Sequence, residues 1–492
     1  MKPSLTEHVY GNNGLLDQLA ALQWIKDNIE DLNGDPRSVT LMGHGTGAAC
    51  VNFLMLSPIS NGLFHRAILM SGSALSDFAM TRDPTQYTLQ VAQSLGCSPS
   101  GRHMMTCLQN KPLSEIKKVQ ILSREFETPL GPVVAGSFIP SEPTQTMASF
   151  PNLLSKYQLL SGVTESESYH DFGVIELDHG VLENQRDEFI KKYAKIVYEG
   201  AEDVALKEIL KQYSPSKLDP QRWSVETNRD VILNLFSDAR TLSPMIRVAN
   251  YQSKANRQSY FYVFGHNSVS TDYAPLNKSV HGEEMPYVLG IPLGGATTHL
   301  HSEYTLREKL LSEVVMRLWT NFVKNGSPNT QSVNEYYTLD RKVWNQYNVE
   351  WPEYNVAHQP YLRLDIPPSI NSLYRSNYTS FWLDTLPNKL SRYVVDPLYA
   401  FTPTTTTQRN RVTHRPIETI RKSIYPPVVH TDYSQPLYGK LRPNPPQYRP
   451  DTDTIYREIQ AIKTPSRPIP PLKTPYIYTT QKPTFNHSKN FK

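Results

Sequence analysis

The sequence predicts an α/β protein built on a mostly parallel sheet, and three observations lead to this fold class. Short β-branched or aromatic runs alternate with segments that repeat apolar residues at helical spacing, which is typical of strands joined by crossover helices. One such run, residues 39–42, enters a glycine-rich turn and then a helical segment. The chain of 492 residues is also long enough for one large α/β core.

The first half of the sequence predicts one amphipathic helix and three strands. Apolar residues recur at helical spacing over residues 15–30, and the turn sequence Asn33-Gly34-Asp35-Pro36 ends that helix. Strands are expected at 39–42 and 64–70, on either side of the helix that follows the glycine turn. A third apolar run, residues 157–163, is also expected to form a strand.

The second half continues the alternation. Residues 260–264 form the clearest buried strand, and a long helix through 310–322 is expected to end at Gly326, whose glycine suits a left-handed C-cap. Residues 361–364 predict a late strand, followed by a helix that runs through 374–383.

The glycine-rich turn reads Gly43-His44-Gly45-Thr46-Gly47. A strand, this turn and a helix are the setting of a nucleophile elbow, Gly-x-Ser-x-Gly, in which the serine is held above the sheet of an α/β-hydrolase. Here Gly45 occupies the serine position, and without an Oγ no acyl-enzyme can form. The turn also fits a dinucleotide-binding fingerprint, but no acidic residue follows at the spacing that would hold a ribose. A plain strand-to-helix turn is the third interpretation.

A hydrolase elbow requires an acid and a histidine later in the chain, in that order. Residues 164–168, which read Thr-Glu-Ser-Glu-Ser, follow the predicted strand 157–163 and supply candidates for the acid. His281 lies in a loop before an apolar stretch and supplies the histidine. The three elements in this order are far more specific than any one of them.

Charge and proline content divide the chain into two regions. Residues 387–492 hold 17 of the 39 prolines and carry a net charge of about +11, whereas the rest carries about −7. We therefore predict a domain at 1–386 and a disordered, basic, Pro/Thr-rich tail or stalk at 387–492. No nucleic-acid partner is expected. No apolar run is long enough to cross a membrane, and the first residues do not read as a signal peptide.

The three cysteines and the asparagine sequons bear on the compartment. Cys97 and Cys107 lie ten residues apart in a turn-rich segment, a spacing that fits either a disulfide or two reduced thiols. Cys50 is expected to be a buried, inert thiol. Sequons begin at Asn277 and Asn377, with a further one at Asn486 in the tail, and they favour a secreted history.

These motifs resemble the cholinesterase/type-B carboxylesterase family. The similarity covers roughly residues 10–386 and includes Asn33-Gly34-Asp35-Pro36, the elbow, His281-Gly282-Glu283 and Trp319-Thr320-Asn321-Phe322. The resemblance implies an α/β-hydrolase fold with Gly45 at the serine position, Glu167 at the acid position and His281 at the histidine position. It also implies that Cys97 and Cys107 form one of the family's loop disulfides.

Within this family, the non-catalytic adhesion branch, the neuroligins, is the most similar. Gly47-Ala48-Ala49-Cys50-Val51-Asn52, residues 281–292 and residues 314–322 carry this likeness. The resemblance implies a cell-surface synaptic protein, an adhesion receptor for presynaptic neurexins, with calcium at the partner interface and no other cofactor. It also implies a homodimer held by a four-helix bundle, from helices near 204–213 and 369–386.

Two departures from the family pattern are expected to matter. The first strands of the fold, the signal peptide and the membrane anchor would lie outside this chain, so we expect an incomplete hydrolase fold. The loop expected to bind the partner differs as well. At the positions that match the family's contact residues, this chain has other residues: Pro151, Leu153, Ser155, Lys156 and Gln158. Because one of these positions is a lysine and Gln158 is not a carboxylate, we expect docking through a bridging calcium ion to be weakened.

Two other functions remain open from the sequence. One is an active carboxylester hydrolase with another nucleophile, for which Thr46 is the elbow's hydroxyl residue. The other is a sensor that binds a small ester or acid, with Glu167 and His281 as polar contacts. No metal site is identified.

Overall fold

The computed structural model describes residues 11–99, 101–214, 224–255, 258–268, 276–294, 303–329 and 346–391. The chain divides into two units, Met1–Thr405 and Thr406–Lys492, and every described residue belongs to the first. The predicted tail at 387–492 therefore lies outside the described residues beyond Ser391.

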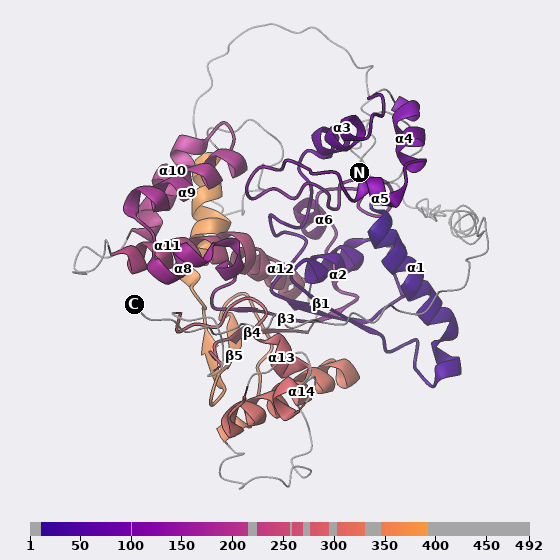
Figure 1. Cartoon of the computed structure of the whole chain (residues 1–492). Helices are drawn as coiled ribbons and strands as arrows, with labels where there is room; N and C mark the ends of the chain where they lie inside the picture. Colours follow the sequence, from indigo (N-terminus) through magenta and orange to yellow (C-terminus); the bar gives the residue numbers. More distant parts are fainter. Residues whose placement is uncertain are drawn as a thin grey trace, which may run out of the picture. The chain divides into compact units, whose positions relative to one another are not determined.

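A six-stranded sheet lies at the centre of the described chain (Figure 1). Its order follows the sequence: β1 (Thr40–His44), β2 (Arg66–Met70), β3 (Gln158–Thr164), β4 (Ser259–Phe264), β5 (Pro360–Leu364) and β6 (Ser369–Ser372). The first five strands are parallel, and β6 pairs antiparallel with β5. The predicted strands are therefore confirmed, with ends shifted by one or two residues.

Helices connect the strands and cover the sheet. They are α1 (Asn13–Asn28), α2 (Thr46–Leu56), α3 (Pro84–Ser94), α4 (Gly101–Gln109), α5 (Leu113–Ile116), α6 (Pro143–Ser149), α7 (Pro151–Leu154), α8 (Val174–His179), α9 (Glu183–Val197), α10 (Glu202–Tyr213), α11 (Val225–Phe236), α12 (Ser243–Lys254), α13 (Met285–Val288), α14 (Leu306–Asn325), α16 (Ser376–Ser380) and α17 (Leu386–Leu390). π-helical turns, Ser237–Leu242 and Phe381–Thr385, join α11 to α12 and α16 to α17. As predicted, α14 ends at Gly326, which has φ +76°.

Both faces of the sheet are buried, which explains why its strands read as nearly continuous apolar runs. Consecutive residues of β2, such as Ala67 and Ile68, point to opposite faces of the sheet and belong to different apolar clusters. One cluster packs the sheet against α1, α2 and α12, and the other packs it against α13 and α14 (Figure 1). A third cluster joins α9, α10 and α11 to the helices after β6.

The prediction of a helix near 369–386 is wrong at its start. Ser369–Ser372 instead forms β6, because the chain reverses after β5 and runs back beside it, so the backbone groups at that edge find partners. The helix begins only at Ser376, after Leu373 and Arg375 adopt left-handed φ values of +57° and +48°.

Candidate functional site

The turn between β1 and α2 is the centre of the candidate site. Gly45 caps α2 with φ +56° and ψ −120°, a conformation that residues with side chains rarely adopt. The backbones also approach closely here. A Cβ on Gly43 would lie 2.3 Å from the Gly47 carbonyl oxygen, and one on Gly72 would lie 2.1 Å from that of Gly45. These glycines therefore permit the tight strand–turn–helix unit that the sequence predicts.

Glu167 and His281 meet beside this turn. Glu167 follows the C-terminal end of β3, and its Oε2 lies 2.6 Å from Nδ1 of His281. Backbone hydrogen bonds hold the two loops together, because the His281 N–H donates to the Ser166 carbonyl (3.2 Å). The Thr164 N–H donates to Oε1 of Glu167 (2.6 Å) and orients the carboxylate. The structure thus places the acid and histidine positions in contact.

Gly45 lies opposite the other nitrogen of this imidazole. A Cβ added at Gly45 would be 3.3 Å from Nε2 of His281. A serine at this position would carry its hydroxyl within reach of the imidazole, whereas the glycine offers no group to activate. Thr46 is exposed at the start of α2, and buried Gly45 is the elbow residue that faces the histidine.

Electrostatics makes Glu167 and His281 an ion pair at neutral pH. Burial alone would lower the pKa of His281, but the hydrogen bond and charge of Glu167 raise it to about 9. Burial acts to raise the pKa of Glu167, yet the hydrogen bond and charge of His281 bring it below its ordinary value. The hydrogen bond between Glu167 and His281 is therefore charge-assisted at neutral pH.

A second layer of polar residues surrounds His281, and the sequence analysis did not identify it. The ring of His44 lies 4.4 Å from that of His281, and its Nε2 is 3.4 Å from Oε1 of Glu284. Ser71 donates to the same carboxylate oxygen (3.1 Å), and Nε2 of His170 is 3.1 Å from the His281 carbonyl oxygen. His44 lies within the elbow, and Glu284 follows His281 by three residues. Their closeness in sequence to Gly45 and His281 was the one signal that could have identified them.

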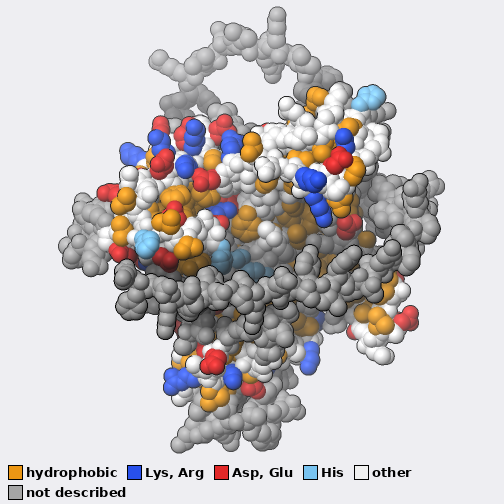
Figure 2. Space-filling model, viewed as in Figure 1, with side chains coloured by type: hydrophobic (Ala, Val, Ile, Leu, Met, Phe, Trp, Pro, Cys, Tyr) orange, Lys and Arg blue, Asp and Glu red, His pale blue; other side chains and the backbone are white. Residues whose placement is uncertain are grey.

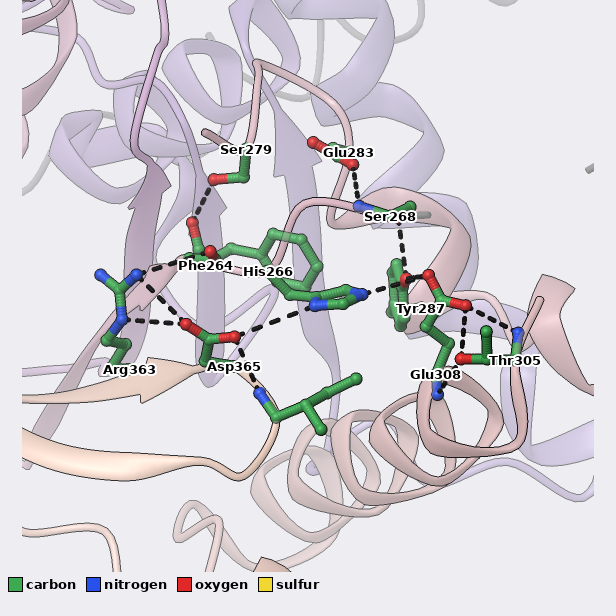
Figure 3. A network of polar contacts seen from close by, with 12 residues as sticks. Phe264, His266, Ser268, Ser279, Glu283, Tyr287, Thr305, Glu308, Arg363 and Asp365 are labelled. Atoms are coloured by element: carbon green, nitrogen blue, oxygen red, sulfur yellow. Dashed lines mark hydrogen bonds and ion pairs between the residues drawn. The ribbon is translucent and has the colours of Figure 1, made fainter. Parts of the chain in front are cut away.

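A buried polar network supports the histidine loop from the side of β4 and β5 (Figure 3). Glu283 accepts from the backbone N–H groups of Ser268 (2.7 Å) and Val280 (3.0 Å) and thereby closes the loop around His281. Farther away, His266 lies between two carboxylates. Its Nε2 is 3.1 Å from Glu308, and its Nδ1 is 3.8 Å from Asp365. We call this the His266 network; sequence reasoning missed it because its members come from four separate segments.

The disulfide is present in the structure. Cys97 and Cys107 are bonded, with their Cα atoms 5.8 Å apart, and the bond joins the end of α3 to α4. A small apolar cluster forms around it. Cys50 is a free thiol on α2; it is half-buried, and burial raises its pKa. The thiol is therefore protonated at neutral pH and unreactive.

Two of the three sequons lie among the described residues. The Asn277 and Asn377 side chains are both exposed. Asn277 precedes the histidine loop, and Asn377 lies in the first turn of α16. Asn486 lies outside the described residues.

The predicted partner-binding loop spans α7 and the start of β3. Pro151, Ser155 and Lys156 are exposed, and Leu153 is half-buried. Gln158 is the first residue of β3. Its amide oxygen accepts from Arg66 (3.0 Å), and its amide nitrogen donates to Gln258 (2.9 Å). In this arrangement Gln158 belongs to the N-terminal end of β3, an interior strand of the sheet.

The helices proposed for dimerisation pack against each other within the chain. The Lys389 ammonium forms an ion pair with Glu208, while the Trp382 indole N–H donates to the Tyr213 hydroxyl (2.7 Å). Glu208 contacts Lys389, and Tyr213, further along α10, contacts Trp382, which comes earlier in the helical segment 376–390. The two helices therefore run antiparallel. We call this arrangement, α10 with residues 376–390, the helix pair.

Neither a metal site nor a membrane-spanning helix is found among the described residues. In the part of the chain that the structure describes, no group of three or more His, Cys, Asp or Glu side chains is placed so that it could hold a metal ion. Over the same ranges, every helix is too short or too polar to cross a bilayer.

Comparison with known proteins gives consistent matches over most of the chain. A profile described as the carboxylesterase family matches residues 3–382. Neuroligin-3 of Mus musculus is 33% identical over 418 residues, which cover 82% of this chain and 50% of that protein. Neuroligin-2 of Homo sapiens is 32% identical, covering 77% and 45% respectively, and Neuroligin-1 of Caenorhabditis elegans is 28% identical, covering 77% and 50%. The chain spans about half the length of these relatives.

Proposed function

This chain belongs to the carboxylesterase family and is of the neuroligin type, and on that basis we propose that it is a non-catalytic cell-adhesion receptor. The observation that supports this proposal best is the position of Gly45. It lies where a Cβ would be 3.3 Å from His281, so the site has its acid and its histidine but no nucleophile. Such a scaffold can bind a protein partner through its surface without hydrolysing an ester.

The proposed partner is a neurexin-family protein or another cell-surface protein, and the proposed location is the extracellular face of the plasma membrane at synapses. Of the loop positions predicted from the sequence, Pro151, Ser155 and Lys156 are exposed, and these are the proposed contact positions. Calcium does not fit this loop, which has no carboxylate, and the amide oxygen of Gln158 already accepts from Arg66. Calcium at the interface would therefore have to be coordinated mainly by the partner.

A direct test measures binding to a neurexin ectodomain. The ectodomain of the full-length protein would be immobilised, and the neurexin passed over it with calcium and with a chelator. The proposal expects binding that Lys156→Glu weakens, because Lys156 is the exposed charge of the loop. Lys111→Glu, at a half-buried lysine outside the loop, is the control. Failure of folded protein to bind under both conditions would exclude a neurexin as partner.

We further propose that two copies associate through the helix pair as a four-helix bundle. The support is that α10 and the C-terminal helix already form half of such a bundle within the chain. Light scattering of the purified ectodomain measures the association, and Lys207→Glu with Lys211→Glu, on the exposed side of α10, should weaken it.

A second candidate function follows from the intact contact between Glu167 and His281. This pair could hold a small acid, because the protonated imidazole carries a positive charge. A thermal-shift screen of small carboxylic acids and esters tests it, with His281→Gln as the control. Stabilisation of both proteins to the same extent would exclude the site. Release of product from an ester by the natural protein would instead support the hydrolase alternative.

A further inference from the structure

The two ends of the helix pair are held in different ways. In Figure 1 the C-terminal helix, in orange, lies beside α9 and α10. At one end the Lys389 ammonium contacts Glu208, and the lysine side chain is 42% exposed, so this ion pair holds the helices only weakly. At the other end Tyr213, the last residue of α10, and Trp382 are both buried. The polar contacts at Tyr213 are therefore the ones expected to fix the position of the pair.

A chain of hydrogen bonds connects this end of the pair to a buried carboxylate. The Trp382 indole N–H donates to the Tyr213 hydroxyl (2.7 Å), and that hydroxyl donates to Oδ2 of Asp238 (2.7 Å). Arg375, which directly precedes the C-terminal helix, donates to both carboxylate oxygens of Asp238 (2.6 and 2.5 Å). Asp238 is 1% exposed, so its charge is compensated within the chain. We call these four residues the Asp238 relay.

The π-helical turn that carries Asp238 is itself attached to the loop of the candidate site. Oγ of Ser237 accepts from the Ser168 N–H (3.1 Å), and Arg240 contacts Asp171 in the same loop. π-helical turns within helices occur frequently at functional sites. This turn gives Asp238 a fixed position from which the carboxylate can hold both helices of the pair.

The outer surface of the pair requires a fixed geometry, because it mixes charged and apolar side chains. On α10, Lys207 and Lys211 are exposed, while Leu206 and Leu210 are partly buried. Figure 2 shows acidic, basic and hydrophobic side chains interspersed in the region where Figure 1 places α9 and α10. In a helix bundle, a shift or rotation of one helix changes which side chains meet across the interface. Helices that are held rigidly also lose less entropy on association.

We propose that the Asp238 relay positions the helix pair for the four-helix bundle, and that the Tyr213 hydroxyl is the group through which it acts. The inference rests on the proposed association of two copies and identifies the residues that set its strength. Tyr213 is buried within its own chain, so it acts indirectly, by holding the end of α10 to Trp382 and Asp238. A twofold bundle uses the same surface of both copies, so a displaced pair weakens the association twice.

Removal of one hydroxyl tests the proposal. In the ectodomain of the full-length protein, Tyr213→Phe removes the oxygen and keeps the ring. Tyr287→Phe is the matched control, because Tyr287 is also buried and its hydroxyl also has two partners, Ser268 (2.8 Å) and Glu308 (3.4 Å), in the His266 network (Figure 3). Analytical ultracentrifugation measures the Kd of association, and urea unfolding measures stability. We expect Tyr213→Phe to raise the Kd about tenfold or more and Tyr287→Phe to leave it unchanged, at similar unfolding midpoints.

Each other outcome has a distinct meaning. An unchanged Kd in Tyr213→Phe would overturn the inference and leave the bundle in place. An equal rise in both variants would also overturn it, because the cause would be a general loss of stability. A wild type that stays a single chain would exclude the bundle itself, and this inference with it.

A second variant tests the carboxylate of the relay. Asp238→Asn keeps the size of the side chain and removes the charge that Arg375 and Tyr213 contact, so it should raise the Kd at least as much as Tyr213→Phe. A folded Asp238→Asn protein that associates like the wild type would overturn the inference. If this variant misfolds, Tyr213→Phe still decides, because it removes only a hydroxyl.

Discussion

At the scale of single residues, position 45 determines what the surrounding groups can do. His281 presents Nε2 to the space where a side chain would begin, and Glu167 holds the opposite nitrogen. The order of the motifs and the family resemblance allowed these positions to be predicted from the sequence. His44 and Glu284 were not predicted, because their contact depends on how two loops more than 200 residues apart pack against each other.

Restoring the hydroxyl tests whether the site retains its chemical geometry. We expect Gly45→Ser to hydrolyse an activated aryl ester slowly, at a rate that rises with pH through about 9 as His281 loses its proton. The serine should also cost about 1 kcal/mol of stability, because φ at residue 45 is +56°. Release of the phenol is measured by absorbance. Gly45→Ala imposes the same backbone strain without a nucleophile, and equal hydrolysis by both variants would contradict the prediction.

The contact between Glu167 and His281 also predicts how stability varies with pH. An unfolded histidine titrates near 6.5, whereas His281 in the folded chain titrates at about 9. The stability that this raised pKa contributes is therefore complete below about pH 6.5 and is lost as the pH rises through about 9. Urea unfolding at pH 6 and pH 9.5 should show the wild type losing on the order of 1–3 kcal/mol more than His281→Gln. A constant difference between the two proteins would contradict this.

At the scale of elements, the sequence predicted those helices and strands that have a strong pattern. The strand β4 reads as one apolar run, and α14 repeats apolar residues before Gly326. The strand β6 was missed because its four residues are all exposed and carry no alternation; it exists because β5 offers an edge to pair with. The π-helical turn at Ser237–Leu242 likewise has no sequence signature, because it depends on the packing of its neighbours.

The start of α14 provides a prediction at this scale. Thr305 accepts from the Glu308 N–H (3.3 Å), and Glu308 accepts from the Thr305 N–H (2.7 Å), which forms a capping box. We expect Thr305→Ala to lower the free energy of unfolding by about 1 kcal/mol, because an N–H at the helix start loses its acceptor. Urea denaturation measures the change. Thr305→Ser keeps the oxygen and should unfold like the wild type, and an equal loss in both variants would exclude the cap as the cause.

At the scale of the whole molecule, a buried ion pair joins segments that are far apart in the sequence. Arg240, in the π-helical turn before α12, is 3.1 Å from Asp77 and also contacts Asp171, and burial raises the pKa of Asp77. The sequence could not predict this pairing, since nothing local distinguishes these residues from exposed ones. The parallel sheet could be predicted, because it follows from a pattern repeated along the chain.

Removing one member of this pair should therefore destabilise the whole domain. We expect Arg240→Ala to lower the free energy of unfolding by about 3–5 kcal/mol, because it leaves the Asp77 carboxylate buried without its partner. Chemical denaturation followed by far-UV circular dichroism measures the loss. Arg37→Ala removes an exposed ion pair with Asp35 and should change stability little. Similar losses in the two variants would show that burial of the pair is unimportant.

The register of the sheet has a consequence for how quickly the protein reaches its native state. Leu159 pairs with Ser259, and Tyr262 pairs with Leu362, so the pairings of β3 with β4 and of β4 with β5 join residues that lie far apart in the sequence. Each pairing must close a long loop before any contact offsets the lost entropy, which makes folding slow. During synthesis β3 emerges long before β4, so the apolar surface of β3 stays exposed until β4 has been made. Production of this chain should therefore depend on chaperones more strongly than that of a helical protein of equal length.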